Sequence, residues 1–312
     1  MRHLPQFTTS HRWPSLLLLL LSSLSSSLSL SFQSCTSSLD EPAPSQLTDV
    51  IITFPDLDIT LAPDDAPTRA TATDANVASV ILSVFDSSGN QVFTTTQSST
   101  DASFGTISTR IPIGDYTFTA LAVADTPADV AITDKTTAAF SAAPPKETFS
   151  TSQEVSITGN TSQSVTMTFG KRITTSLYVK VTDATPAEVQ KMQVIVSPSA
   201  TKPSAYAIDP STGLAADTWK YEKTVEKSET VTTFTDQYVA IMFFLTSATE
   251  QLDFTVNMLS ATDEVLYTRT KTGVTFNRAA KTFATGTFFS SQSAATFDFD
   301  TTDGQSTNIT LD

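Results

Sequence analysis

The chain has 312 residues, a formal net charge of −14, one cysteine and two histidines. The acidic excess argues against nucleic acid and anionic membrane surfaces as partners, because both are bound through Lys and Arg. Both histidines, His3 and His11, lie ahead of Cys35, the only thiol. The rest of the chain therefore cannot use histidine or thiol catalysis, a zinc site of the usual His/Cys type or an intrachain disulfide.

An export signal is predicted for residues 1–34. Basic Arg2 and Arg12 precede an apolar run, SLLLLLL, that begins at Ser15, and small serine-rich residues follow it. That order is typical of a secretory signal. The serines argue against a membrane-spanning helix, which needs about 20 predominantly apolar residues. Because two arginines leave with the signal, 32 Asp and Glu remain against 16 Lys and Arg.

Cys35 directly follows this segment and resembles the lipobox cysteine of bacterial lipoproteins, which is acylated and becomes the new N-terminus. Ser34 suits the small residue before the cut, whereas Phe32 and Gln33 depart from the usual pattern. The alternative is an ordinary secretory signal followed by an incidental thiol. An unpaired cysteine in an exported chain calls for an explanation, so we expect Cys35 to carry a lipid that anchors the protein in the outer membrane. Residues 35–47 would form the lipidated tether.

Strand signals begin after the tether. The stretch VIITFPDLDITL (Val50–Leu61) alternates but changes phase at Pro55, which predicts an edge strand with a bulge or break. The stretch VASVILSVFDSSGNQVFTTT predicts a hairpin with its turn at residues 86–90. A further strand is predicted in IPIGDYTFTALAVA, with Tyr116 and Phe118 on one face.

The pattern then fades and restarts. Residues 125–152 have no clear period and predict a surface loop. SVTMTF (164–169) alternates again as a half-buried strand, and a new phase begins at GKRITTSLYVKV. We therefore place a domain boundary there, with an N-terminal β-sandwich at 48–170 and a C-terminal β-sandwich at 171–312.

The second half consists of short strand signals. TPAE (Thr185–Glu188) is a capping box with proline at the first helical position, which predicts one short helix. Strands are predicted at MQVIV, YVAIMFFL, LDFTVNML, EVLYTRT, GVTF, FATGTFF, ATFDFD and STNITL. Many short strands separated by turns indicate an all-β fold of two tandem sandwiches.

Four segments resemble, in order, the Bacteroidales fimbrillin-like proteins, which are subunits of type V fimbriae. TRATATDANVASVILSVFDSSGN is similar to their start, and IPIGDYTFTALAVA to their Gly-x-Tyr strand. FGKRITTSLYVKVTDATPAEVQKMQVIVS resembles the opening of their second sandwich. VTFNRAAKTFATGTFFSS resembles a late segment that ends in Gly-x-Phe-Phe. The resemblance covers most of the chain beyond the tether.

The resemblance implies two tandem transthyretin-like Greek-key β-sandwiches, export as a lipoprotein and a role as a stalk, tip or anchor subunit with other fimbrial subunits as partners. In polymerising members an Arg-specific protease cuts after the first strand, and a neighbour's donor strand fills the vacated groove. Arg69, followed by Ala70, stands at the matching place. Anchor subunits often carry extra N-terminal cysteines, which this sequence lacks.

The sequence offers weaker signals for other sites. DFDTTDG (Asp298–Gly304) is acidic like a calcium loop, but its spacing differs from an EF-hand and Phe alternates with Asp as in a strand. Nothing in the sequence pairs two carboxylates for catalysis, so we expect no metal, no cofactor and no enzyme activity. Trp219 and Tyr221, in DTWKYE, could stack on sugar rings, although packing of such a Trp against the sandwich is commoner.

The combined expectation is a surface-exposed fimbrial or adhesin lipoprotein of the outer membrane. It would assemble or adhere through β-strand exchange and bind a host or bacterial surface ligand. The alternative is a surface glycan-binding lipoprotein of a nutrient-uptake system, in which Trp219 and Tyr221 would contact the glycan.

Overall fold

The computed structural model of the chain consists of strands, turns and loops. The residues that it describes are 46–57, 77–124, 130–141, 146–159, 161–170, 172–228, 231–235, 237–289, 297–301 and 307–309, the last two ranges by their backbone alone. No helix occurs in these ranges, and hence none that is long and apolar enough to cross a membrane. The predicted all-β fold is confirmed.

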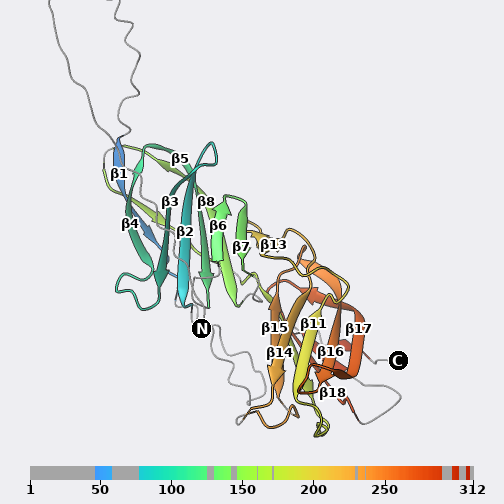
Figure 1. Cartoon of the computed structure of the whole chain (residues 1–312). Helices are drawn as coiled ribbons and strands as arrows, with labels where there is room; N and C mark the ends of the chain where they lie inside the picture. The colour runs from blue at the N-terminus through green and yellow to red at the C-terminus, as the bar shows by residue number, and fades with distance from the viewer. Residues whose placement is uncertain are drawn as a thin grey trace, which may run out of the picture. The chain divides into compact units, whose positions relative to one another are not determined.

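The first sandwich consists of two sheets, with strand orders β4-β1-β9 and β3-β2-β5-β8 (Figure 1). Its strands are β1 (Leu47–Thr53), β2 (Ser79–Asp86), β3 (Gln91–Ser98), β4 (Thr106–Pro112), β5 (Gly114–Val123), β8 (Thr148–Ile157) and β9 (Gln163–Thr166). Alternate residues of a strand point to opposite faces, so each sheet can give one face to a shared core. Val50, Val84 and Phe118 lie in that core.

The second sandwich has sheets of order β14-β11-β16-β17 and β15-β10-β18-β19-β20. Its strands are β10 (Thr175–Val181), β11 (Lys191–Val196), β14 (Tyr221–Glu226), β15 (Tyr238–Phe243), β16 (Thr249–Leu259), β17 (Val265–Asn277), β18 (Lys281–Gly286), β19 (Phe297–Thr301) and β20 (Thr307–Ile309). Leu177, Val194 and Phe254 lie in the core between the two sheets.

The two sandwiches repeat one topology. The first strand of each, β1 or β10, lies between an antiparallel neighbour, β4 or β15, and a parallel neighbour, β9 or β18. The facing sheets also correspond, because β3-β2-β5-β8 is matched by β14-β11-β16-β17. The second sandwich extends its sheet beyond β18 with β19 and β20.

Each sandwich also carries an inserted hairpin, and the two hairpins pair with one another. The first is β6 (Val130–Asp134) with β7 (Thr137–Phe140), and the second is β12 (Tyr206–Asp209) with β13 (Leu214–Ala215). β7 pairs with β12, which produces a four-stranded sheet of order β13-β12-β7-β6. The ring of Phe140 lies 4.9 Å from that of Phe244. A sheet contributed half by each sandwich therefore joins them within the compact unit Pro44–Asp312.

Strand β2 is buried on both faces because it contributes to two cores. Val80 and Val84 pack in the core of the first sandwich. Ile81 and Phe85 point the other way, into the core that contains the joining sheet and the second sandwich. A strand that is covered on both faces has a nearly continuous run of apolar residues, which explains why apolar residues do not alternate with polar ones in SVILSVF.

The predicted hairpin is confirmed. β2 and β3 pair antiparallel, with an irregularity between Val84 and Phe85. The Asp86 carboxylate accepts hydrogen bonds from the backbone N–H groups of Ser88 and Asn90 at 2.9 and 2.8 Å. It also accepts one from the Asn90 side chain, and the bonds from Asn90 hold the pKa of Asp86 below its ordinary value. Gly89 has φ +85°, a conformation that glycine adopts without strain.

The predicted helix at Thr185–Glu188 is wrong. The segment forms a turn in which the N–H of Val189 donates to the carbonyl of Pro186 at 3.2 Å. The Thr185 hydroxyl, which would cap the helix, instead lies 3.4 Å from Oγ1 of Thr235. Contacts with a remote segment thus replace the local capping that the sequence favours.

The predicted loop at 125–152 is also wrong over much of its length. It contains β6, β7 and the start of β8, and Ile132, Phe140 and Phe149 are 5%, 3% and 1% exposed. Alanine and threonine occupy many of its positions, so the apolar alternation is faint in the sequence. The stretches EVLYTRT and GVTF, predicted as separate strands, are parts of the single strand β17.

Candidate functional site

Strand β1 lies in the middle of its sheet. It pairs antiparallel with β4 from Leu47 to Thr53 and parallel with β9 from Val50 to Thr53. The prediction of an edge strand is therefore wrong. The predicted break at Pro55 is confirmed, because β1 ends at Thr53 and a turn follows at residues 55–56; residues 58–61 of the predicted strand lie outside the described residues.

The inward side chains of β1 fill the core of the first sandwich. Val50 and Ile52 are 0% exposed and Phe54 is 3% exposed. The Phe54 ring stacks on Phe169, with centroids 5.2 Å apart and planes at 14°. Fully burying one such side chain contributes roughly 1.5–3 kcal/mol. A first sandwich without β1 would expose an apolar groove between β4 and β9.

Hydrogen bonds fasten both ends of β1. At its start, the Thr48 hydroxyl donates to the carbonyl of Gly159 at 2.6 Å. At its end, the N–H of Phe54 donates to the carbonyl of Gly105 at 2.9 Å. Just beyond, the Asp56 carboxylate accepts a hydrogen bond from the N–H of Phe169 at 2.8 Å. The strand is thus held by its neighbours on both sides as well as by its side chains.

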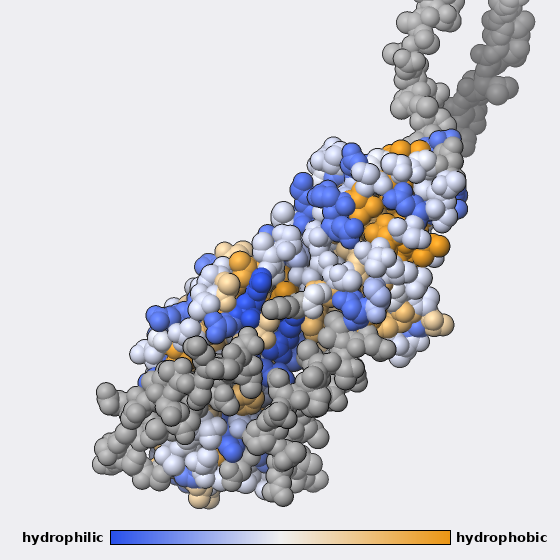
Figure 2. Space-filling model, turned by 180° about the vertical axis from the view of Figure 1, so that it is seen from behind, coloured by the Kyte–Doolittle hydropathy of each residue, from blue (hydrophilic) through white to orange (hydrophobic). Residues whose placement is uncertain are grey.

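The outer face of β1 is exposed. Leu47 and Ile51 are 46% and 37% exposed, and Asp49 forms an ion pair with Arg110 at 3.2 Å. Both charged side chains of this pair are largely in solvent, where such pairs contribute little. Figure 2 shows hydrophobic side chains gathered in patches among residues of intermediate and hydrophilic character on one face of the molecule.

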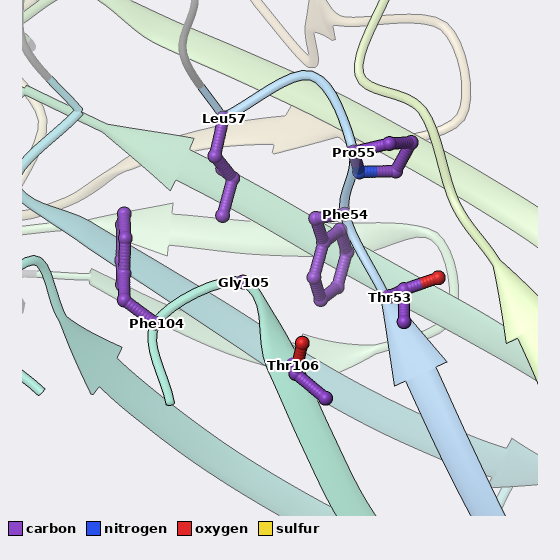
Figure 3. A pocket seen from close by; sticks show the side chains of 7 residues that line it. All are labelled: Thr53, Phe54, Pro55, Leu57, Phe104, Gly105 and Thr106. Carbon is purple, nitrogen blue, oxygen red and sulfur yellow. The ribbon is translucent and has the colours of Figure 1, made fainter. Parts of the chain in front are cut away.

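A hollow of about 330 Å³ lies at the end of β1. Its walls are formed by the residues Thr53, Phe54, Pro55, Leu57, Phe104, Gly105 and Thr106. Leu57 and Phe104 project into this space from opposite sides (Figure 3). Gly105 has φ +86°, and a Cβ atom there would lie 3.0 Å from the end of the Leu57 side chain. The close approach of the two chain segments therefore depends on glycine.

The predicted lipidation site Cys35 and the predicted processing site Arg69–Ala70 lie outside the described residues. Leu57 is the last described residue before the segment that contains Arg69. These assignments stay predictions.

Trp219 and Tyr221 are described, and they differ in exposure. Tyr221 is 1% exposed, and its ring stacks on Tyr206 at 4.7 Å and tilts against Phe243 at 5.8 Å. Burial raises the pKa of the Tyr221 hydroxyl far above its ordinary value. Trp219 is only partly buried and contacts Tyr206 edge-on at 5.8 Å. The two rings therefore share one aromatic cluster but not one exposed surface.

The surroundings of β1 include residues that sequence reasoning did not assign to it. Phe169, Phe104 and Gly105 come from segments remote in the sequence, and no local signal places them beside Phe54. Among the residues that the structure describes, no group of three or more His, Cys, Asp or Glu side chains could hold a metal ion.

The fold and this site define a class of all-β protein with two sandwiches of the same topology and a buried, doubly paired first strand. The chain belongs to the family described as "Fimbrillin-A associated anchor proteins Mfa1 and Mfa2", whose family model matches residues 40–312. No curated protein sequence matches the chain.

Solved structures that resemble this chain come from species of Bacteroides, Porphyromonas and Parabacteroides. A candidate polysaccharide-binding protein of Bacteroides thetaiotaomicron is 15% identical with a TM-score of 0.51, over 84% of this chain and 98% of that one. The fimbrial anchor protein Mfa2 of Porphyromonas gingivalis is 11% identical with a TM-score of 0.46, over 84% and 99%. A fimbrial assembly protein of Parabacteroides distasonis is 10% identical with a TM-score of 0.45, over 85% and 99%. The similarity to the Bacteroides thetaiotaomicron structure shows that it and this chain share a fold.

Proposed function

We propose that this chain is an outer-membrane lipoprotein of the fimbrial anchor and adhesin type that joins other fimbrial subunits by exchange of β1. Its family, described as fimbrial anchor proteins, supports the association with fimbriae. Cys35 would hold the uncut protein at the membrane. After a cut at Arg69 and the loss of β1, contacts with other fimbrial subunits would hold the sandwiches. The role is structural and adhesive, without catalysis, and the surface ligand would belong to a host or bacterial cell.

The position of β1 carries the proposal of strand exchange. It fills a complete groove between β4 and β9 with apolar side chains at alternate positions. A strand of another subunit with the same alternation would reproduce both ladders and the packing, which is the general basis of recognition by strand addition. β1 precedes every other described strand, so one cut between it and β2 would leave it attached to the sandwich by hydrogen bonds and packing alone.

The equivalent strand of the second sandwich is not suited to exchange. β10 is covalently connected to β9 before it and to β11 after it along the chain. Arg172, just before β10, donates a buried hydrogen bond to the carboxylate of Glu147. Exchange is therefore assigned to the first sandwich alone.

Mild trypsin treatment tests the proposal. We expect a new N-terminus at Ala70 and oligomers of the cut protein, whereas Arg69→Ala stays uncut at this position and monomeric. Lys135→Ala, which removes an exposed cation of the β6–β7 turn, is the matched control and should behave like the unaltered protein. A cut protein that retains β1 and remains monomeric would contradict strand exchange.

Surface glycan binding is the alternative proposal. One solved structure carries a polysaccharide-binding description, but at 15% identity it shows the fold alone. The buried ring of Tyr221 has no free face for a sugar, so Trp219 is the residue to test. Binding of a soluble glycan that is abolished by Trp219→Ala and kept by Thr218→Ala would favour this alternative.

A further inference from the structure

The hollow at the end of β1 is continuous with the groove that this strand fills. Phe54 is the last buried side chain of β1, and it also forms part of the wall of the hollow. The bond from the N–H of Phe54 to the carbonyl of Gly105 is the last one between β1 and this side of the groove. Beyond it the two backbones diverge, and the Leu57 side chain points back toward Gly105 (Figure 3).

The lining of the hollow suits one large apolar side chain. Leu57 and Phe104 are only partly buried, and both pack against the core of the first sandwich. A third apolar side chain between them would remove from water the surfaces that they still expose. The neighbouring Thr53 and Thr106 end the β1–β4 ladder and flank this space.

Displacement of β1 needs a starting point. A competing strand cannot enter the groove directly, because the ladders of β1 and the burial of Val50 and Ile52 must be lost first. A side chain that seats in the hollow displaces none of the residues that the structure describes. It would hold the competing strand beside β1 while the end of β1 frays. The chain leaves the C-terminal end of β1 through Leu57 and continues to Arg69. The proposed cut after Arg69 would therefore free β1 at the end that lies beside the hollow.

We propose that the hollow is the entry point for the donor strand of another fimbrial subunit. The occupant is the leading end of an extended segment, with a side chain of Leu, Ile or Phe size seated between Leu57 and Phe104. The donor then replaces β1 progressively from Thr53 toward Leu47. This inference rests on the strand exchange proposed above.

Two synthetic peptides test the entry point. The peptide LTDVIITFTLT repeats Leu47–Phe54 and continues with Thr-Leu-Thr in place of the turn that begins at Pro55. The peptide LTDVIITFTST differs only in having serine for that added leucine. Each is labelled with fluorescein, and its uptake is followed by fluorescence anisotropy. A recognition site for a highly specific protease is inserted between Arg69 and Ala70, and the protein is cut at this site before the peptide is added.

We expect the leucine peptide to enter about tenfold faster than the serine peptide, because only its leading side chain gains burial in the hollow. Thr106→Phe fills the hollow and should slow the leucine peptide to the rate of the serine peptide. Ser108→Phe, an exposed position on the same strand outside the hollow, should leave both rates unchanged.

The outcomes separate this inference from the function on which it rests. Equal uptake of the two peptides by the cut protein, or undiminished uptake by a folded Thr106→Phe variant, overturns the entry point and leaves strand exchange standing. No uptake of either peptide overturns strand exchange itself. Thermal unfolding of each variant verifies that it is folded. If Thr106→Phe does not fold, the uptake rates of the two peptides by the cut protein with Thr106 unchanged decide whether the hollow is the entry point.

Discussion

Arg172 donates a hydrogen bond from Nη1 to Oε1 of Glu147 at 2.7 Å, and the two side chains are 6% and 8% exposed. Nη2 of Arg172 donates to the carbonyl of Ala279 at 2.7 Å. Glu147 directly precedes β8 of the first sandwich, whereas Arg172 and Ala279 flank strands of the second. Nε of Arg172 and Oε2 of Glu147 have no partner among the described groups. One buried ion pair thus ties together segments of both sandwiches.

Breaking this ion pair from one side should destabilise the protein strongly. Arg172→Met leaves the Glu147 carboxylate buried without its cation, which costs about 3–5 kcal/mol in free energy of unfolding. The double variant Arg172→Met with Glu147→Leu should lose less than Arg172→Met alone, because no charge is left buried. Urea denaturation of both variants measures this difference, and a double variant that loses as much stability as Arg172→Met, or more, would contradict it.

The anchoring of β1 should depend on its inward side chains. Phe54→Ala removes the ring that stacks on Phe169 and leaves a cavity, and such changes cost about 3–5 kcal/mol. Ile51→Ala, on the exposed face of the same strand, should cost less than about 1 kcal/mol. Urea denaturation of the full chain compares the two. Equal losses would mean that β1 is not packed as described.

Two glycines with similar backbone conformations should differ in their tolerance of alanine. Gly89 has φ +85° and open space where a Cβ atom would lie, so Gly89→Ala should cost about 1–2 kcal/mol from backbone strain alone. Gly213 has φ +69°, and a Cβ atom there would lie 2.4 Å from Cγ2 of Ile173. Gly213→Ala should therefore cost about 1–3 kcal/mol more than Gly89→Ala. Thermal or urea unfolding of the two variants ranks them, and the reverse order would be inconsistent with this packing.

Stability should fall at alkaline pH because of buried tyrosines. Burial raises the pKa of Tyr221 far above its ordinary value, and it raises the pKa of Tyr178 and Tyr206 in the same direction. In the unfolded chain these groups titrate near pH 10. Since the folded state holds their protons more tightly, their contribution is complete below about pH 10 and is lost as the pH rises above it.

Ultraviolet titration of the phenol groups and urea midpoints between about pH 8 and 12 measure this effect. In Tyr221→Phe the urea midpoint should fall less steeply with rising pH than in the unaltered protein. Tyr267→Phe removes a more exposed hydroxyl and should change this pH dependence less than Tyr221→Phe does. Titration of all six tyrosines near pH 10 in the folded protein would contradict the prediction.

Membrane attachment should depend on Cys35. Cys35→Ala is expected to move the protein from the membrane fraction to the soluble fraction, because each buried CH₂ of an acyl chain contributes about 0.8 kcal/mol to membrane binding. Ser37→Ala, two residues further along, is the matched control and should remain membrane-bound. Fractionation of intact cells followed by detection of the protein measures both, and retention of Cys35→Ala at the membrane would refute lipid anchoring at this residue.

The β2–β3 hairpin and the all-β class could be predicted from the sequence because their determinants are local. The turn at 86–90 holds Asp86, Gly89 and Asn90 at the positions that its hydrogen bonds and positive φ need. The alternation of Val50, Ile52 and Phe54 likewise predicts one buried face for β1, since side chains in a strand alternate between its two faces. These features require no knowledge of any distant residue.

The tertiary structure decided what distant segments bring together. β1 lies in the middle of its sheet because β4 and β9 pair with it from both sides, and a proline near its end says nothing about those partners. The hollow combines Leu57 with Phe104 and Gly105, and Tyr221 is buried because Tyr206 and Phe243 cover its ring. The alanine- and threonine-rich strands β6 and β7 are stabilised by the pairing of β7 with β12 and by burial in the core that includes the second sandwich, rather than by their own pattern. Burial and strand pairing are properties of neighbours in space, which the local order of residues does not specify.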